Sequence, residues 1–235
     1  MQTHPPARRG AKLPLSPPIP RLVPGRWPAL LVVLAALLPV SGGNAPVVAE
    51  TADAAAPVYV VSITGTIDLG LAPYLERVVG EAVDAGAPAV ILEIDTPGGR
   101  LDAVLQMQDT LLDADVRTIA FVNRTAFSAG ALIAIAAEEI YMVPGAVMGA
   151  ATPVDAAGET ASEKVVSAVR KTFKTTAEVR GREPLVAEAM VDPDVAIDGL
   201  VAWSELLTLT TNEATTWATR MASLPIVTSC SRQPG

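Results

Sequence analysis

Throughout the central part of this chain, short runs rich in β-branched residues alternate with longer runs whose apolar residues have helical spacing. The first three short runs are residues 58–63, 89–94 and 116–122, and the helical runs between them are residues 71–86 and 101–114. A chain that repeats strand, helix and strand with short connections places its strands in parallel in one sheet. The alternation therefore predicts an α/β fold with a mostly parallel β-sheet flanked by helices.

The next segments extend the pattern. A further helix is predicted after Ser128, a short strand at residues 139–143, a loop of small residues at 144–162, and a helix at 163–179 that stops near Gly181. Apolar residues make up 50% of the chain, with only three each of Phe, Tyr and Trp, so the core must consist of Val, Ile, Leu and Ala. Such a core suits parallel strands covered by helices, and 235 residues suit one domain.

Residues 1–49 are predicted to lie outside this domain. Residues 1–28 are basic and Pro-rich, and residues 29–40 form an apolar run that is short for a membrane helix of about 20 residues. With a small-residue cleavage site at residues 47–49, this arrangement is typical of an export signal. An uncleaved N-terminal membrane anchor is the alternative. Either interpretation predicts an exported, membrane-associated protein with its folded domain on the extracytoplasmic side.

The charge distribution argues against a nucleic-acid partner. The first acidic residue is Glu50, so all five basic residues before it belong to the N-terminal segment. Without that segment the formal net charge falls from −8 to −13. Phosphate binding needs a basic face, which such a composition does not easily supply.

Ser128 stands at the beginning of a run that is otherwise small and apolar, and it is the candidate nucleophile. The only histidine is His4, in the N-terminal segment, so the chain alone cannot form a Ser-His-Asp triad. A lysine held neutral by apolar surroundings is the remaining kind of base. Beyond residue 12 the only lysines are Lys164, Lys171 and Lys174. Lys164, at the predicted start of its helix, is the best placed; the other two are predicted to be solvated surface charges.

The segment Asp95–Gly99, "DTPGG", follows a predicted buried strand. Paired glycines allow a close backbone approach, and their N–H groups can face a developing oxyanion. The N–H of Ala129, at a helix N-terminus, is a second candidate donor. Each feature also has a plainer interpretation: a helix-capping serine, an exposed lysine and a tight turn. Their joint placement at the carboxyl ends of consecutive strands favours a site, since open α/β sheets bind ligands there.

Several segments closely resemble the nodulation efficiency D (NfeD) family of membrane-associated serine proteases. They are "LEIDTPGG", "AFSAGALIAIAAEEIYMVPGAVMGAATPV", "EKVV" and "AMVDPDVAIDG" with the following "LLTLTTNEA". The resemblance implies the ClpP-like, crotonase-like fold, with Ser128 as nucleophile and Lys164 as general base. It implies an oxyanion hole formed by Ala129 and glycines of "DTPGG", chiefly Gly99 with Gly98 beside it. It also implies a homodimer or larger homo-oligomer, and a link to stomatin-like membrane proteins whose hydrophobic segments are cleaved.

The resemblance covers residues 57–214 and ends there. The family pattern would continue with a leucine-glycine-hydrophobic-Ala-Asp-Gly segment and membrane helices, whereas residues 215–235 read "TTWATRMASLPIVTSCSRQPG". Reading the back-translated codons one nucleotide earlier permits the expected segment. We therefore predict a protease domain at residues 50–214, followed by an atypical tail that a frameshift would explain. The nucleotide sequence around Thr215 tests this hypothesis.

The sequence thus predicts a serine endopeptidase that forms an acyl-enzyme and needs no metal or other cofactor. Two alternatives remain open. The first is a catalytically silent scaffold that binds a membrane partner through the same groove. The second is an acyl-CoA enzyme of the crotonase type, which would share the fold and the oxyanion hole but would need neither a Ser-Lys pair nor an export signal.

Overall fold

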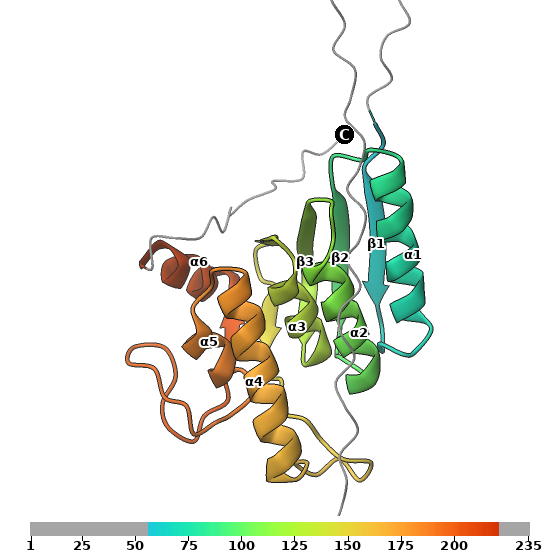
Figure 1. The fold of residues 1–235 in the computed structure, drawn as a ribbon. Coiled ribbons are helices and arrows are strands. Elements are labelled where there is room, and N and C mark those ends of the chain that lie inside the picture. Colours follow the sequence, from blue (N-terminus) through green and yellow to red (C-terminus); the bar gives the residue numbers. More distant parts are fainter. Residues whose placement is uncertain (1–55, 221–235) are drawn as a thin grey trace, which may run out of the picture. The chain divides into compact units, whose positions relative to one another are not determined.

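A computed structural model describes residues 56–220, with side chains up to residue 216. The predictions for the N-terminal segment, residues 1–49, and for residues 221–235 lie outside this range. The described residues form a sheet of six strands with six helices (Figure 1). None of the described helices is long and apolar enough to cross a membrane.

The strands form one mostly parallel sheet, as predicted. Its path runs β1-β2-β3-β5-β6, and β4 pairs with β3 beside β5. Only the pairing of β5 with β6 is antiparallel. The strands are β1 (Tyr59–Thr64), β2 (Val90–Thr96), β3 (Thr118–Phe127), β4 (Glu139–Met142), β5 (Val147–Gly149) and β6 (Thr208–Thr210).

Strand β3 is the longest of these strands and has two partners on one side. Its first half pairs with β4, from Ile119 to Val122, and its last three residues pair with β5. The β3–β5 pairing ends at Phe127 opposite Gly149, immediately before Ser128. The long strand therefore carries the candidate nucleophile to the carboxyl end of the sheet.

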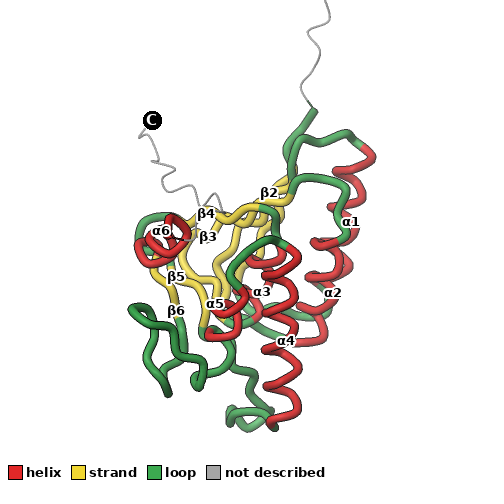
Figure 2. Tube along the Cα trace, turned by 60° about the vertical axis from the view of Figure 1, so that its left-hand side comes forward, coloured by secondary structure: helices red, strands yellow, loops and turns green. Residues whose placement is uncertain are grey.

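Most of the helices lie together on one side of the sheet, and α6 (Thr211–Arg220) lies apart from them, next to β6 (Figure 2). In α1 (Leu71–Asp84) the buried residues Ala72, Leu75, Val79 and Ala82 follow helical spacing, which gives the helix one apolar face. All eight residues of α3 (Ala129–Ala136) are buried, which requires side chains that are apolar all round. The other helices are α2 (Leu101–Leu112), α4 (Glu163–Val179) and α5 (Pro184–Ala189).

Two arginines after α4 bind the carbonyl ends of α2 and α3. Arg180 donates to the carbonyls of Leu111 and Ala136, both at 2.6 Å. Arg182 donates to the carbonyls of Ile135, at 2.8 Å, and Glu138, at 2.9 Å. The cations satisfy carbonyls that a helix end leaves without partners. Burial, together with the nearby charge of Arg180, lowers the pKa of Arg182 to about 10.

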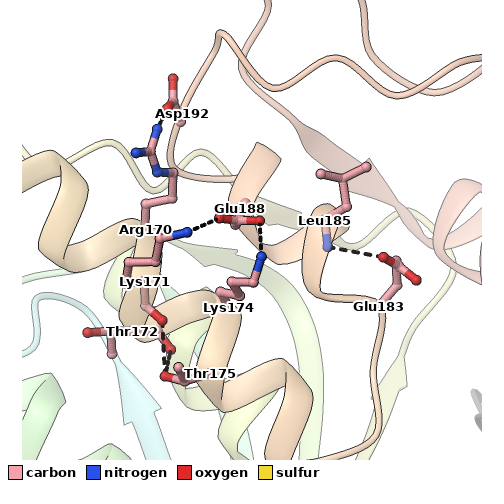
Figure 3. Close-up of polar contacts among 9 residues, drawn as sticks. All are labelled: Arg170, Lys171, Thr172, Lys174, Thr175, Glu183, Leu185, Glu188 and Asp192. Atoms are coloured by element: carbon pink, nitrogen blue, oxygen red, sulfur yellow. Dashed lines mark hydrogen bonds and ion pairs between the residues drawn. The ribbon is translucent and has the colours of Figure 1, made fainter.

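A cluster of charged residues joins α4 to α5 (Figure 3). The buried Glu188 of α5 accepts a hydrogen bond of 2.9 Å from Lys171 and another of 2.9 Å from Lys174. Arg170 of α4 forms an ion pair with Asp192. Burial opposes the ionisation of Glu188, but the two lysines outweigh it and lower the pKa of its carboxyl. The prediction of a surface charge holds for Lys171, whose side chain is 57% exposed, whereas Lys174 is half-buried. Neither ion pair with Glu188 was predicted.

The other differences from the predicted elements concern short segments. Strand β5 lies inside the predicted loop 144–162, and α5 and β6 were not predicted. Helix α6 continues through Thr215, where the atypical tail was predicted to begin.

Candidate active site

Ser128 lies between β3 and α3 in an unusual backbone conformation. Its φ of 52° and ψ of −116° belong to a region that residues with a β-carbon rarely adopt. Its N–H donates to the carbonyl of Gly149 at 2.9 Å, which continues the β3–β5 pairing by one residue. The side chain makes no capping hydrogen bond to α3, so the interpretation as a helix-capping serine is wrong. The half-buried hydroxyl remains available for chemistry.

The Gly98–Gly99 segment packs directly against this serine. Gly98 has a φ of +110°, and a β-carbon at that position would lie 2.7 Å from the β-carbon of Ser128 and 3.3 Å from its hydroxyl oxygen. The structure thus brings together the loop after β2 and the residue after β3. Only glycine allows this approach, because any side chain would clash with the serine.

The two glycine N–H groups have different roles. The N–H of Gly98 donates to the hydroxyl of Thr96 at 3.0 Å. Gly99 is exposed, and its N–H has no acceptor among residues 56–220. The backbone of Ile67 packs directly against this glycine, since a β-carbon on Gly99 would lie 2.1 Å from the Ile67 carbonyl oxygen. The Gly99 N–H is therefore the available donor of this loop.

A second free donor is the N–H of Ala129. It belongs to the first residue of α3, where backbone N–H groups have no partner within the helix. Within the described part of the chain no acceptor for it is present. Ala129 follows Ser128 directly, so this donor lies next to the serine. It also belongs to the N-terminus of a helix, where the helix dipole is positive.

Lys164 lies in the first turn of α4, as predicted, and its side chain is exposed. The start of this helix lies on the side to which the β1 arrow points, the carboxyl side of the sheet (Figure 1). No hydrogen bond joins Lys164 to Ser128 in residues 56–220. The described residues therefore show no hydrogen bond between Lys164 and Ser128 of the kind that a general base needs.

Other kinds of site have no support in the described region. No group of three or more His, Cys, Asp or Glu side chains there could hold a metal ion. A groove of about 560 Å³ runs between α1 and α2, with Glu76, Asp84, Asp109 and Asp113 in its walls. None of the predicted site residues lines this groove.

Comparison with known proteins shows the family to which the chain belongs. The family model described as "NfeD1b, N-terminal domain" matches residues 57–220. The chain belongs to this NfeD1b family. Its NfeD1b domain is 39% identical over 158 residues to the membrane protein NfeD1b of Bacillus subtilis. It is 30% identical over 148 residues to the membrane-bound protease PH1510 of Pyrococcus horikoshii. These alignments cover 67% and 60% of the chain, but only 36% and 34% of the relatives.

Solved structures show the same fold for the NfeD1b domain. Two are mutants of 1510-N, described as a membrane-bound stomatin-specific protease. The serine-to-alanine mutant has a TM-score of 0.61 at 26% identity, covering 74% of this chain and 80% of that one. The lysine-to-alanine mutant, in complex with a substrate peptide, has a TM-score of 0.63 at 27% identity and covers 76% and 78%. ClpP1 of Listeria monocytogenes, at 19% identity and a TM-score of 0.51, shares the fold over 67% of this chain and 86% of that one. The prediction of a ClpP-like fold is confirmed.

Sequence reasoning missed two residues that bond to the candidate site. Gly149 holds the N–H of Ser128, and Thr96 holds the N–H of Gly98. A β-carbon on Gly149 would lie 2.5 Å from the carbonyl oxygen of Leu207, the residue before β6, so the need for glycine here depends on a segment distant in sequence. Thr96 carried a signal that was not used: a polar residue at the end of a buried strand needs a hydrogen-bond partner.

Proposed function

We propose that this chain is a serine endopeptidase in which Ser128 is the nucleophile and Lys164 the general base. The proposed oxyanion donors are the N–H groups of Gly99 and Ala129. The observation that carries the proposal is the strained Ser128, whose hydroxyl caps no helix and packs against the Gly98–Gly99 segment. Gly98 contributes by having no side chain, which leaves room for the serine.

In the proposed reaction, the Ser128 Oγ attacks the carbonyl carbon of the scissile peptide bond while the neutral Lys164 amine accepts the hydroxyl proton. The carbonyl oxygen becomes an oxyanion that the two N–H groups stabilise. When the intermediate collapses, the C–N bond breaks and the lysine returns its proton to the leaving amine. Water then attacks the acyl-enzyme by the same route and releases the second product.

The exposed position of Lys164 adds a condition to this mechanism. A lysine acts as a base only where apolar surroundings disfavour its charged form. The proposal therefore requires that a bound hydrophobic polypeptide, or a second copy of the chain, covers the start of α4. This fits the predicted homodimer or larger homo-oligomer. The 1510-N relative is described as specific for a stomatin, which supports a stomatin-like membrane protein as substrate or partner.

The relatives named as membrane proteins also support membrane association. We place the protease domain on the extracytoplasmic side, in accordance with the export signal or anchor that the sequence predicts. Substrates would then be hydrophobic segments of membrane-associated proteins that reach this side.

The test compares turnover of a hydrophobic peptide, and labelling by a serine-reactive fluorophosphonate, in the full chain and three variants. Ser128→Ala and Lys164→Ala should abolish both signals. Lys164→Arg is the sharper variant, because it keeps the positive charge but cannot give up its proton at working pH. It should be as inactive as Lys164→Ala. Turnover that survives in all three variants would disprove the dyad.

A silent scaffold is the second candidate, and the exposure of Lys164 is the observation that favours it. A scaffold would bind the hydrophobic peptide as tightly in Ser128→Ala as in the unmodified chain, with no turnover in either. Product formation by the unmodified chain, lost in Ser128→Ala, would exclude it.

A further inference from the structure

Thr96 is a fully buried polar residue at the end of β2, and the proposed mechanism does not use it. Its hydroxyl bonds to the backbone of two loops: it donates to the carbonyl of Gly65 at 2.5 Å and accepts from the N–H of Gly98 at 3.0 Å. A threonine hydroxyl has one proton to donate, and the Gly65 carbonyl is a nearer acceptor than the Gly98 carbonyl, which lies at 3.3 Å. The hydroxyl thus joins the loop after β1 to the loop after β2.

The methyl group of the same side chain contacts the start of α3. A β-carbon on Gly130 would lie 2.5 Å from the Thr96 methyl carbon, so this methyl packs on the backbone of the first turn of α3. Gly130 is the residue after Ala129. One buried side chain therefore contacts the segments that carry both proposed oxyanion donors: its hydroxyl holds the residue before Gly99, and its methyl holds the residue after Ala129.

We propose that Thr96 is a positioning residue that fixes the separation between the N–H groups of Gly99 and Ala129. This inference rests on the proposed function, which assigns these two N–H groups to an oxyanion hole. Oxyanion donors must lie about 2.7–3.1 Å from the oxygen they stabilise, so a small shift of either segment weakens the transition state. Binding of the substrate in its ground state depends much less on this separation.

Two substitutions separate the two contacts. Thr96→Val keeps the shape and the methyl that packs on Gly130, but it removes the hydroxyl. Thr96→Ser keeps the hydroxyl and removes the methyl. Thr118 offers a matched control at the other end of the sheet. It is also fully buried, and its hydroxyl accepts a hydrogen bond of 3.0 Å from the N–H of Glu138. Thr118→Val thus removes one buried threonine hydroxyl away from the site.

The first measurement is amide hydrogen exchange and chemical shift by NMR on the full chain, which needs no enzymatic activity. In Thr96→Val, the Gly98 amide should exchange at least about tenfold faster, and the Gly99 and Ala129 signals should move. In Thr96→Ser, the Gly98 protection should remain while the Ala129 and Gly130 signals move. Unchanged signals from Gly99 and Ala129 in both threonine variants would overturn the proposal. If Thr96→Val does not fold, the Ala129 signal of Thr96→Ser tests the proposal by itself.

The second measurement is steady-state peptide cleavage. Thr96→Val should lower kcat about 10- to 100-fold while KM changes less than about twofold, because only the transition state uses the oxyanion hole. Thr96→Ser should restore kcat to within about tenfold of the unmodified chain, and Thr118→Val should leave it unchanged. An equal loss of kcat in Thr118→Val would show a general loss of stability and overturn the assignment. Activity that persists in Ser128→Ala would refute the proposed function instead, and the NMR result would still decide the role of Thr96.

Discussion

Gly98 and Ser128 approach each other so closely that a β-carbon on the glycine would lie 2.7 Å from the β-carbon of the serine. The two residues are 30 positions apart and follow neighbouring strands, β2 and β3. This contact makes the loop after β2 one wall of the candidate site. It also means that the smallest possible side chain at residue 98 must displace either the loop or the nucleophile.

The first prediction concerns this contact. Gly98→Ala should abolish peptide cleavage and reduce the free energy of unfolding by about 2–4 kcal/mol, through the clash and through the positive φ. Gly145→Ala is the matched control, because Gly145 also has a positive φ, of 85°, but no atom lies within 4 Å of a β-carbon there. It should cost about 1 kcal/mol and leave turnover intact. Urea denaturation and kinetics on both variants test the difference.

The second prediction concerns the strain at Ser128. Glycine tolerates a φ of 52° with a ψ of −116°, so Ser128→Gly should raise the free energy of unfolding by about 1 kcal/mol relative to Ser128→Ala. Neither variant should cleave peptide. A stability gain with complete loss of activity would indicate strain that is kept for function. If Ser128→Gly is no more stable than Ser128→Ala, the backbone there is not strained.

The third prediction concerns pH and the buried Glu188 between Lys171 and Lys174. The lysines lower its pKa in the fold, so its ionised form stabilises the protein at pH values above the ordinary carboxyl pKa of 4.5. This contribution should be lost as the pH falls from about 4.5 through the lowered pKa. Glu188→Gln should remove this part of the acid dependence and reduce stability at pH 7. Urea denaturation of the unmodified chain and of Glu188→Gln at a series of pH values measures the difference. An equal acid dependence in the two proteins would contradict the prediction.

The fourth prediction concerns Arg182, whose two hydrogen bonds satisfy the carbonyls of Ile135 and Glu138. Arg182→Met keeps the length of the side chain but leaves both carbonyls without the charged donor. It should reduce the free energy of unfolding by about 2–3 kcal/mol. Arg124→Met, at an exposed arginine, should change it by less than about 0.5 kcal/mol. Thermal unfolding of the two variants at equal protein concentration makes the comparison.

The main fold could be predicted from the sequence because its long elements have clear patterns. Helix α1 and strand β2 depend on residues within a few positions of each other, and they lie within two residues of their predicted ends. Strands β5 and β6 have three residues each, too few to show a period, and they form because they pair with each other and with the end of β3. Similarly, the ion pairs of Lys171 and Lys174 could not be predicted, because their partner Glu188 lies on α5, a different element.

The candidate site was predictable only in part, for a related reason. Ser128 could be chosen because it begins a small, apolar run, and a lysine base followed because the only histidine is His4 in the N-terminal segment. Both are properties of the sequence itself. The choice of Gly99 over Gly98 as the donor came only from the family resemblance, since it depends on Thr96 accepting from Gly98 rather than from Gly99. Which N–H bonds to Thr96 depends on the backbone conformation of the turn, and residue types alone do not predict it.

The last prediction concerns the covering of Lys164, which the proposed mechanism requires. In the isolated chain both Lys164 and Lys171 are exposed, so an amine-reactive ester should modify both, as mass spectrometry of the digested protein can show. A hydrophobic peptide aldehyde that bonds reversibly to Ser128 should reduce the modification of Lys164 at least about fivefold, because a covered amine is shielded from the reagent. Lys171, which lies two turns further along α4 and bonds to Glu188, should be modified to the same extent with or without the aldehyde. If aldehyde binding leaves Lys164 as reactive as before, the substrate does not cover it. Lys164 must then be protected at high protein concentration, where a second copy of the chain can cover it. Full reactivity under both conditions would remove Lys164 as the base and leave Ser128 without a partner in this chain.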